Sequence, residues 1–474
     1  MRPLWTVAEV VKATGGHPEG LSDGPIFSIS IDSREIAPEA LFVAIKGDKL
    51  DGHDFVGKAL EAGATAALVS EAHFKALGGE RVIVVPDTLK ALEALGIAAR
   101  ARNRGQIVAV TGSAGKTTTK EAIRTVLSAF GETHYSIKSF NNHWGVPLML
   151  ARLPREAQFG VFEIGMNHAG EITPLVRMVR PHVAVITTVA AAHLEFFNSV
   201  SEIAAAKAEI FLGLEPGGVA VLNTDHDYLH VLFAHARAAG VANVVTYGFD
   251  DSADWHILRA DASPKGTLAE VVFAGEHYNF QLQVPGRHMV ANAVAALAVA
   301  RASGEGVRAA ISALGKFGAP EGRGQSLALG PPGRPLLLVD ESYNANVASM
   351  NAAMDVYTTI AAPGGRKVLV LGDMLEMGPQ GPQLHAGLAG AVLRTGARHV
   401  FLVGEAMRAL ADELRRHAES DRDAPAVTHM PTAAEISDEV LATLAYGDAV
   451  MVKGSNGVRL AQLVQKIRER FENA

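Results

Sequence analysis

Short apolar runs alternate with helical patterns along most of the chain. The first stretch predicts four strands and one helix, at 26–31, 41–45, 66–69, 82–85 and 53–61. Pro86-Asp87-Thr88 interrupts this series, and a helical pattern over 89–102 leads into the next one. We therefore expect a first domain boundary near residue 87.

The second stretch contains five runs typical of buried strands. They lie at 107–110, 160–164, 183–187, 219–222 and 244–247. Helical patterns between such strands are typical of βαβ units and a mostly parallel sheet. Alternating residues over 254–284 predict a small antiparallel addition instead, and a helix should follow at 289–302.

A Gly/Pro-rich segment at 316–324 suggests a second boundary, and four more strands are expected after it. They lie at 336–339, 368–371, 400–403 and 449–452. The whole pattern predicts an α/β protein of three domains, 1–86, 87–319 and 320–474. In open α/β sheets, ligands bind beyond the carboxyl ends of the strands, so functional residues are expected there.

The amino-acid composition mainly excludes certain kinds of site and certain binding partners. The 474 residues include no cysteine, which excludes disulfides, thiolate zinc sites and cysteine nucleophiles. The net charge of −7, from 43 basic and 50 acidic side chains, gives no support for a nucleic-acid or membrane-surface binder. The N-terminus lacks the pattern of a signal peptide, and no run approaches 18 apolar residues. We expect a cytoplasmic protein.

The clearest local motif follows the first strand of the second stretch. It comprises Thr111, Gly112, Ser113, Ala114, Gly115, Lys116, Thr117 and Thr118. Backbone N–H groups of such a turn, with the N-terminus of the next helix, hold an anion. Lys116 would neutralise terminal phosphates, and the Thr117 hydroxyl would bind Mg²⁺. The loop is shorter than the usual Walker pattern, so an ordinary glycine-rich turn is the alternative, but we expect a nucleoside triphosphate site.

Two polar residues lie at or shortly after the carboxyl ends of two strands in this stretch. Glu163 ends one strand and His193 follows another, so both are candidate Mg²⁺ ligands beside the phosphate loop. Taken singly, Glu163 could be a cap or surface residue and His193 a structural histidine.

Lys207 falls inside an apolar helical stripe, between Ile203 and Phe211. The aliphatic part of its side chain could pack against the apolar face while the ammonium extends outward to water. The alternative is a buried lysine whose lowered pKa lets it react or be modified.

The third stretch offers Asp340 after its first strand, Arg323 in the linker and Lys453 after its last strand. Arg323 could reach a nucleotide between domains, although an exposed arginine is the default. Lys453 could bind an anion or be a solvated loop lysine.

Taken together, these motifs resemble the Mur ligase family over essentially the whole chain. The segments that carry the resemblance are 32–34, 41–44, 51–55, 111–118, 140–147, 163–171, 192–195, 206–211, 343–346, 371–378 and 453–455. The resemblance implies an N-terminal UDP-substrate domain, a central ATPase-like domain and a Rossmann-like C-terminal domain. It also implies that ATP phosphorylates the C-terminal carboxylate of UDP-MurNAc-tripeptide, and that the amine of D-Ala-D-Ala then attacks the acyl phosphate.

The resemblance also implies residue roles. Lys116, Lys207 and His193 would be catalytic, with Thr117, Glu163, His193 and a CO₂-derived carbamate on Lys207 serving Mg²⁺. Nucleotide-binding positions would be the phosphate loop with Asn292, Arg323 and Asp340. Substrate-binding positions would be Ser33, Arg34, Phe42, Lys46, Asp51, His53, Asn141 and Asn142.

Three readings of the activity compete. The absence of an Asn-Pro-Arg motif favours the member that adds the dipeptide over the member that adds the third residue. A P-loop NTPase acting as a switch or motor would hydrolyse ATP without either peptide substrate. A folylpolyglutamate synthase would share the central and last domains, but the N-terminal segment with its Asp32-Ser-Arg motif argues against it. We expect the chain to act as a monomer.

Overall fold

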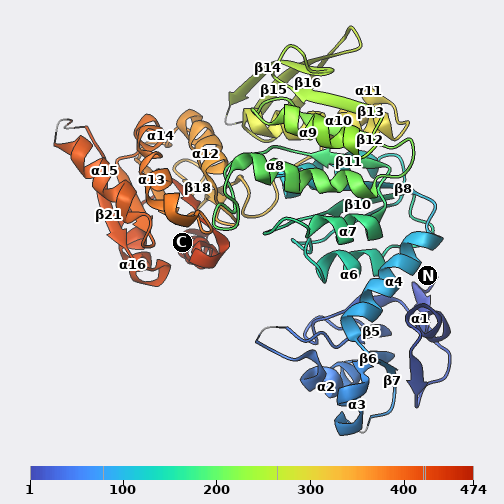
Figure 1. Ribbon diagram of the computed structural model, residues 1–474. Coiled ribbons are helices and arrows are strands. Elements are labelled where there is room, and N and C mark those ends of the chain that lie inside the picture. The colour runs from blue at the N-terminus through green and yellow to red at the C-terminus, as the bar shows by residue number, and fades with distance from the viewer. Residues whose placement is uncertain are drawn as a thin grey trace.

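A computed structural model describes residues 2–47, 49–77, 79–263, 265–419, 421 and 423–472. Three lobes follow one another along the chain, each built on its own large sheet (Figure 1). The blue first lobe lies below the green central lobe, and the orange and red third lobe lies to the side of it. The predicted α/β class is confirmed.

The first lobe is organised around a five-stranded sheet. Its strand order is β2 (His17–Glu19), β7 (Val82–Val85), β6 (Ala66–Ser70), β5 (Ala40–Val43) and β4 (Ser28–Ser30). All pairings are parallel except that of β2 with β7. The predicted strand at 26–31 is divided, because β3 (Pro25–Ile26) pairs with β1 (Trp5–Thr6) while β4 joins the main sheet. The helices are α1 (Val7–Thr14), α2 (Val56–Glu61), which follows the 3-10 turn η1 (Gly52–Phe55), and α3 (Glu71–Leu77).

The central lobe contains a nine-stranded sheet. Its parallel strands are β9 (Thr133–Tyr135), β10 (Phe159–Glu163), β8 (Gln106–Thr111), β11 (Val183–Ile186), β12 (Val219–Asn223) and β13 (Asn243–Gly248), and the next strand, β14 (Trp255–Ser263), also pairs in parallel with β13. The predicted antiparallel addition is confirmed as β14, β15 (Gly266–Phe273) and β16 (Glu276–Leu282). Strand β8 lies between β10 and β11, so the loops that follow these three strands meet at one edge of the sheet.

Helices cover this sheet on both faces. They are α5 (Lys116–Leu127), α6 (Gly145–Ala151), α7 (Ile172–Val179), α8 (Val200–Ala208), which continues as the 3-10 segment η2 (Glu209–Gly213), α9 (Leu229–Ala238), α10 (Arg287–Ala302) and α11 (Val307–Leu314). Because both faces are covered, the inner strands are apolar along their length rather than alternating. This explains why the apolar runs in the sequence predicted these strands.

The third lobe contains a six-stranded sheet with the order β17 (Gln325–Leu329), β18 (Leu336–Glu341), β22 (Ala449–Lys453), β19 (Lys367–Gly372), β20 (His399–Val403) and β21 (Ala426–Met430). Only β17 is antiparallel to its neighbour. The sequence pattern predicted the four inner strands but neither edge strand. Strands β17 and β21 are only half-buried, so their sequences do not form apolar runs.

The helices of this lobe are α12 (Val347–Thr359), α13 (Gly381–Ala386), α14 (Ala389–Arg394), α15 (Arg408–Ala418), α16 (Ala433–Thr443) and α17 (Leu460–Glu472). Across the described ranges of the chain, no helix has both the length and the apolar character needed to span a membrane.

The first and central lobes share one hydrophobic core. Helix α4 (Thr88–Arg102) lies between them and contributes apolar side chains to a cluster that draws on both lobes (Figure 1). Trp5 of the first lobe donates its indole N–H to the carbonyl of Ala151 at 2.9 Å, and Arg152 donates to the carbonyl of Ile29 at 2.6 Å. These contacts hold the first sheet firmly against the central one.

Candidate functional site

A cavity of about 780 Å³ lies at the carboxyl ends of the central strands. Its walls come from the central lobe and from the third lobe. Eleven of the predicted site residues line it: Ser113, Ala114, Gly115, Lys116, Thr117, Thr118, Asn141, Glu163, His193, Asn292 and Arg323. The fold therefore brings together residues that are up to 210 positions apart (113 to 323).

The phosphate loop is held tightly by its neighbours. Gly112 has φ +151°, and a Cβ there would lie 1.9 Å from the hydroxyl of Thr187. That hydroxyl donates to the carbonyl of Ala114 at 2.5 Å. Gly115 has φ +80° and precedes α5, whose N-terminus points into the cavity wall. A side chain at either glycine would disturb the loop, and the exposed helix terminus suits an anion.

Lys116 belongs to the first turn of α5 and lines the cavity. Its ammonium donates to the carbonyl of Gly112 at 2.9 Å, so it lies directly over the loop. Burial lowers the pKa of Lys116, the Glu163 carboxylate opposes that shift, and the charge of Arg323 adds to it. A phosphate in the loop would give this lysine the anionic partner that favours its charged form.

Glu163 ends β10 and is almost completely buried. One carboxylate oxygen accepts a hydrogen bond from the Thr117 hydroxyl and the other from the Asn141 amide, both at 2.8 Å. No ion pair to Glu163 exists among the residues that the structure describes. A buried carboxylate beside a hydroxyl is a set of hard oxygen donors, which fits Mg²⁺.

His193 reaches the same cavity from the loop after β11, where its backbone adopts φ +56°. Its Nδ1 lies 2.5 Å from the Glu376 carboxylate of the third lobe. The hydrogen bond to His193 lowers the pKa of Glu376. Glu376 lies in one of the motifs behind the family resemblance, but nothing in its spacing pointed to His193, because the two are 183 positions apart.

Lys207 lies near the end of α8, and only 1% of its surface is exposed. This burial contradicts the alternative in which its ammonium extends to water. The apolar face expected around it continues past α8 into η2. Within the described parts of the chain the ammonium has no hydrogen-bond or ion-pair partner, and it does not line the cavity. Burial, and secondarily the charge of Lys116, lowers the pKa of Lys207 well below its usual value.

The predicted nucleotide residues take different positions. Arg323 lines the cavity with its guanidinium 4.2 Å above the ring of Tyr343. Asn292 accepts a hydrogen bond from Thr119 at 3.0 Å and lies against Gly115. Asp340 is buried, and its carboxylate accepts two hydrogen bonds from Ser342, so it shapes the turn after β18 rather than lining the cavity.

Three other predicted residues lie next to the site without lining the cavity. Thr111 is the buried last residue of β8, and Gly112 follows it outside the cavity wall. The side chain of Asn142 accepts the backbone N–H of Gly145, where α6 begins.

The predicted substrate residues of the first lobe lie outside this cavity. Arg34 is exposed and makes a bidentate pair with Asp32, while Ser33 is half-buried between them. Lys46 is exposed and forms a backbone bridge with Asp51. Phe42 is completely buried in the core of the lobe, which leaves it no surface for a ligand.

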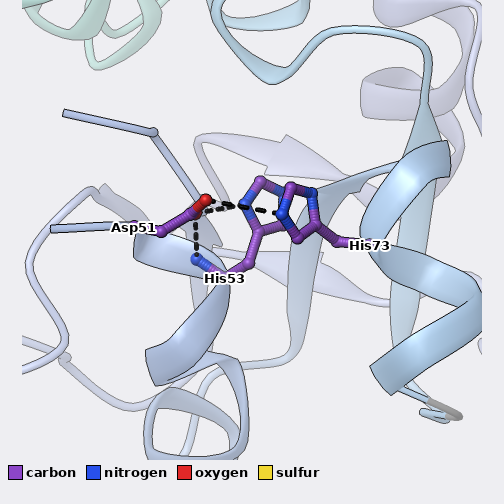
Figure 2. Close-up of side chains that lie close together, drawn as sticks. All are labelled: Asp51, His53 and His73. Carbon is purple, nitrogen blue, oxygen red and sulfur yellow. Dashed lines mark hydrogen bonds and ion pairs between the residues drawn. The ribbon is translucent and has the colours of Figure 1, made fainter. Parts of the chain in front are cut away.

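Figure 2 shows Asp51 and His53 together with His73, a residue that the sequence did not indicate. His53 Nδ1 lies 2.6 Å from the Asp51 carboxylate, and its Nε2 accepts the backbone N–H of Ser70 at 3.1 Å. His73 stacks on His53 with ring centroids 3.9 Å apart. Because both nitrogens of His53 are already engaged, internal hydrogen bonds account for this cluster, and His53 positions Asp51 rather than contacting a ligand.

Lys453 also lines the cavity, but as a paired residue. It is 2% exposed, which contradicts the solvated alternative, and its ammonium lies 3.2 Å from Glu341 and 3.1 Å from the carbonyl of Asn344. Tyr343 is a further lining residue that the sequence did not single out, although it belongs to one of the motifs that carried the resemblance.

Comparison with known proteins gives a consistent result along the chain. Residues 25–104 match the catalytic domain of the Mur ligase family, residues 110–300 the Mur ligase middle domain, and residues 329–456 the Mur ligase glutamate ligase domain. A UDP-N-acetylmuramoyl-tripeptide–D-alanyl-D-alanine ligase of Escherichia coli K12 is 33% identical over 470 residues, which is 98% of each chain.

Two solved structures share the fold. A crystal structure of MurF from Acinetobacter baumannii superposes with a TM-score of 0.83 at 30% identity and covers 98% of this chain and 99% of its own. The MurF ligase of Thermotoga maritima, solved in complex with ADP, has a TM-score of 0.74 at 24% identity and covers 93% and 97%.

Proposed function

The chain belongs to the Mur ligase family, and we propose that it joins D-alanyl-D-alanine to UDP-N-acetylmuramoyl-tripeptide while ATP is converted to ADP and phosphate. The observation that carries this proposal is the match of 98% of the chain to a ligase of that name. The cavity supports it, because a phosphate loop and buried oxygen ligands line one wall and the third lobe lines the other.

The residues around the cavity suit phosphoryl transfer to a carboxylate. The N-terminus of α5 and Lys116 would bind the phosphates and offset the charge that develops on the transferred group. Thr117, Glu163 and His193 would hold Mg²⁺, which supplies Lewis-acid stabilisation of phosphate oxygens when bound. The transfer leaves ADP and an acyl phosphate on the tripeptide.

The second step joins the peptides. The amine of D-alanyl-D-alanine attacks the acyl carbon, the C–O bond to phosphate breaks, and an amide and free phosphate remain after the amine loses its protons. The acyl phosphate must be kept from water, and a cavity between two lobes provides such an enclosure when they approach each other.

Lys207 is proposed to act as a carbamate. Its uncharged amine would add to CO₂ with loss of one proton, which converts a would-be cation into an anion. Two observations support this: the ammonium has no anionic partner among the described residues, and it is buried within the electrostatic influence of Lys116. A carbamate anion there would lie within the electrostatic influence of the Lys116 ammonium and would add an oxygen ligand for Mg²⁺.

The first lobe is proposed to bind the UDP part of the substrate through four polar positions, of which Arg34 and Lys46 are exposed and Ser33 and Asp51 are half-buried. We also propose domain boundaries near residues 87 and 319, because each large sheet lies within one of the three resulting segments. That a single copy of the chain is the acting unit stays a prediction, as does the cytoplasmic location.

The decisive experiment is phosphate release from ATP with UDP-MurNAc-tripeptide, with and without D-alanyl-D-alanine. The proposal requires release that depends on both substrates. Hydrolysis that needs neither substrate would instead support an NTPase switch or motor. Addition of glutamate to a folate, measured in parallel, would support a folylpolyglutamate synthase.

A further inference from the structure

Glu376 contacts a proposed metal ligand from across the boundary between two lobes. It lies after β19 in the third lobe, whereas His193 follows β11 in the central lobe. Two contacts join the segments: the Glu376 carboxylate is 2.5 Å from His193 Nδ1, and its carbonyl accepts the backbone N–H of Glu195 at 3.1 Å. Both side chains line the cavity.

This contact determines which nitrogen of His193 is free. The carboxylate accepts the proton on Nδ1, which leaves the lone pair on Nε2. Nε2 has no partner among the residues that the structure describes. Metal-binding histidines commonly donate their other ring N–H to a carboxylate, which fixes the tautomer and the ring orientation and increases the basicity of the ligand.

The backbone at both residues is unusual in the same way. His193 has φ +56° and Glu376 has φ +62°, a region that residues other than glycine seldom adopt. Gly378 lies beside this contact with φ +59°, and a Cβ there would be 3.1 Å from the carbonyl of Leu194. Strained backbone of this kind persists where surrounding contacts hold it, and here it directs the two side chains toward each other.

We propose that Glu376 is a positioning residue that orients His193 for Mg²⁺ and thereby couples approach of the third lobe to formation of the metal site. The inference rests on the proposed function, in which His193 is a metal ligand. When the lobes separate, His193 loses its carboxylate partner and binds metal less tightly. When they meet, the ring is fixed with Nε2 available. Metal affinity therefore depends on the lobe arrangement, although Glu376 itself does not touch the metal.

The test measures metal binding directly. Mn²⁺ is titrated into the full-length protein in the presence of ADP, and free Mn²⁺ is measured by electron paramagnetic resonance. Glu376→Ala should weaken binding by about 10- to 100-fold, the usual effect of removing such a partner. Glu376→Gln, which keeps the size and a hydrogen-bonding oxygen, should weaken it less. Glu419→Gln changes an exposed glutamate of the same lobe and should leave binding unchanged.

A double variant separates positioning from a general structural effect. His193→Ala should weaken Mn²⁺ binding, and adding Glu376→Ala should weaken it no further, because Glu376 acts only through His193. Unchanged affinity in Glu376→Ala, or additive losses in the double variant, would overturn the inference. If Glu376→Ala fails to fold, Glu376→Gln decides in its place, and affinity equal to the wild type then overturns the inference. Substrate-dependent phosphate release by the wild type judges the proposed function separately.

Discussion

Lys116 and Lys207 are two lysines whose charges disfavour each other. Lys207 is buried, whereas Lys116 is half-buried at the cavity wall, and the charge of Lys116 adds to the lowering of the pKa of Lys207. Two nearby ammonium groups shielded from water cannot both remain charged without anions nearby. Lys116 has Glu163 within its electrostatic range and the proposed phosphate site beside it, whereas Lys207 has no such anionic partner among the residues that the structure describes. The two lysines therefore suit different chemistry.

Replacement of Lys207 tests the carbamate. We expect Lys207→Ala to lose nearly all ligase activity, because the proposed anionic ligand disappears. Added bicarbonate or short carboxylic acids should restore part of the activity by supplying a carboxylate in the vacated space. The measurement is substrate-dependent phosphate release over a titration of the acid. Lys90→Ala, at an exposed helical lysine, is the matched control. Full activity of Lys207→Ala without any acid would contradict the proposal.

Replacement of Lys116 tests the position of the phosphates. Lys116→Ala should reduce turnover by roughly two or more orders of magnitude, the effect of removing one preorganised charge-stabilising group. Steady-state phosphate release at saturating substrates measures it. Lys120→Ala is an informative comparison, because Lys120 lies on the same helix and donates to the backbone of Ser136 instead of facing the cavity. Wild-type turnover in Lys116→Ala would mean that the phosphates bind elsewhere.

At the scale of elements, the segment 136–142 between β9 and α6 is held by all three lobes. Glu35 of the first lobe lies 2.8 Å from the ammonium of Lys138. Tyr343 of the third lobe donates its hydroxyl to Ser139 at 2.5 Å. Asn141 donates to Glu163 within the central lobe. This loop links the proposed UDP-binding lobe, the proposed metal ligand and the third lobe.

Removing the hydrogen bond between Tyr343 and Ser139 tests whether this loop depends on its contact with the third lobe. Tyr343→Phe should reduce the stabilisation of the transition state by about 1 kcal/mol, which corresponds to a roughly fivefold loss in kcat/KM for ATP. The loop then loses its hydrogen bond to the third lobe, while the ring still packs beneath the Arg323 guanidinium. Ser139→Ala should have a similar effect. The double variant should be no worse than either single variant. Additive losses measured by steady-state kinetics would show that the two side chains act independently.

At the scale of the whole molecule, the lobe junctions differ in kind. The first and central lobes share apolar core, including Trp5, whereas the central and third lobes meet around the cavity through polar contacts such as that of His193 with Glu376. Opening an apolar junction exposes hydrophobic surface to water, which costs free energy, whereas polar contacts can be replaced by contacts with water at a lower cost in free energy. Movement is therefore expected between the central and third lobes.

Trp5→Ala tests the first junction. Trp5 is almost fully buried, lies beneath the guanidinium of Arg102 at 3.6 Å and donates to Ala151. Its truncation should lower the free energy of unfolding by about 3–5 kcal/mol, mostly through the cavity it leaves. Urea denaturation followed by circular dichroism measures the change. Phe233→Ala, at an aromatic residue that is 41% exposed, should change it by less than about 0.5 kcal/mol. Equal effects of the two variants would contradict a shared core.

The sequence by itself determined those strands, helices and loops whose signals lie in adjacent residues. Covered parallel strands appear as apolar runs, so the inner strands of all three sheets were predicted, while the half-buried β17 and β21 were not. The phosphate loop was predictable because a strand, two glycines, a lysine and a helix start are adjacent in the chain. The family motifs also indicated Glu163, His193 and Lys207 before any distance was known.

Only the tertiary structure decided which residues meet. Lys207 is a buried amine with no partner among the described residues, and a periodic pattern alone left its burial open. Phe42 and Asp340 are buried supports, although their motifs suggested ligand contacts. The contact of Glu376 with His193 joins positions 183 residues apart. Local patterns predict helices and strands because the periodicity and burial of each segment are written in its own residues, whereas such contacts, like the pairing of distant strands, depend on how whole lobes pack.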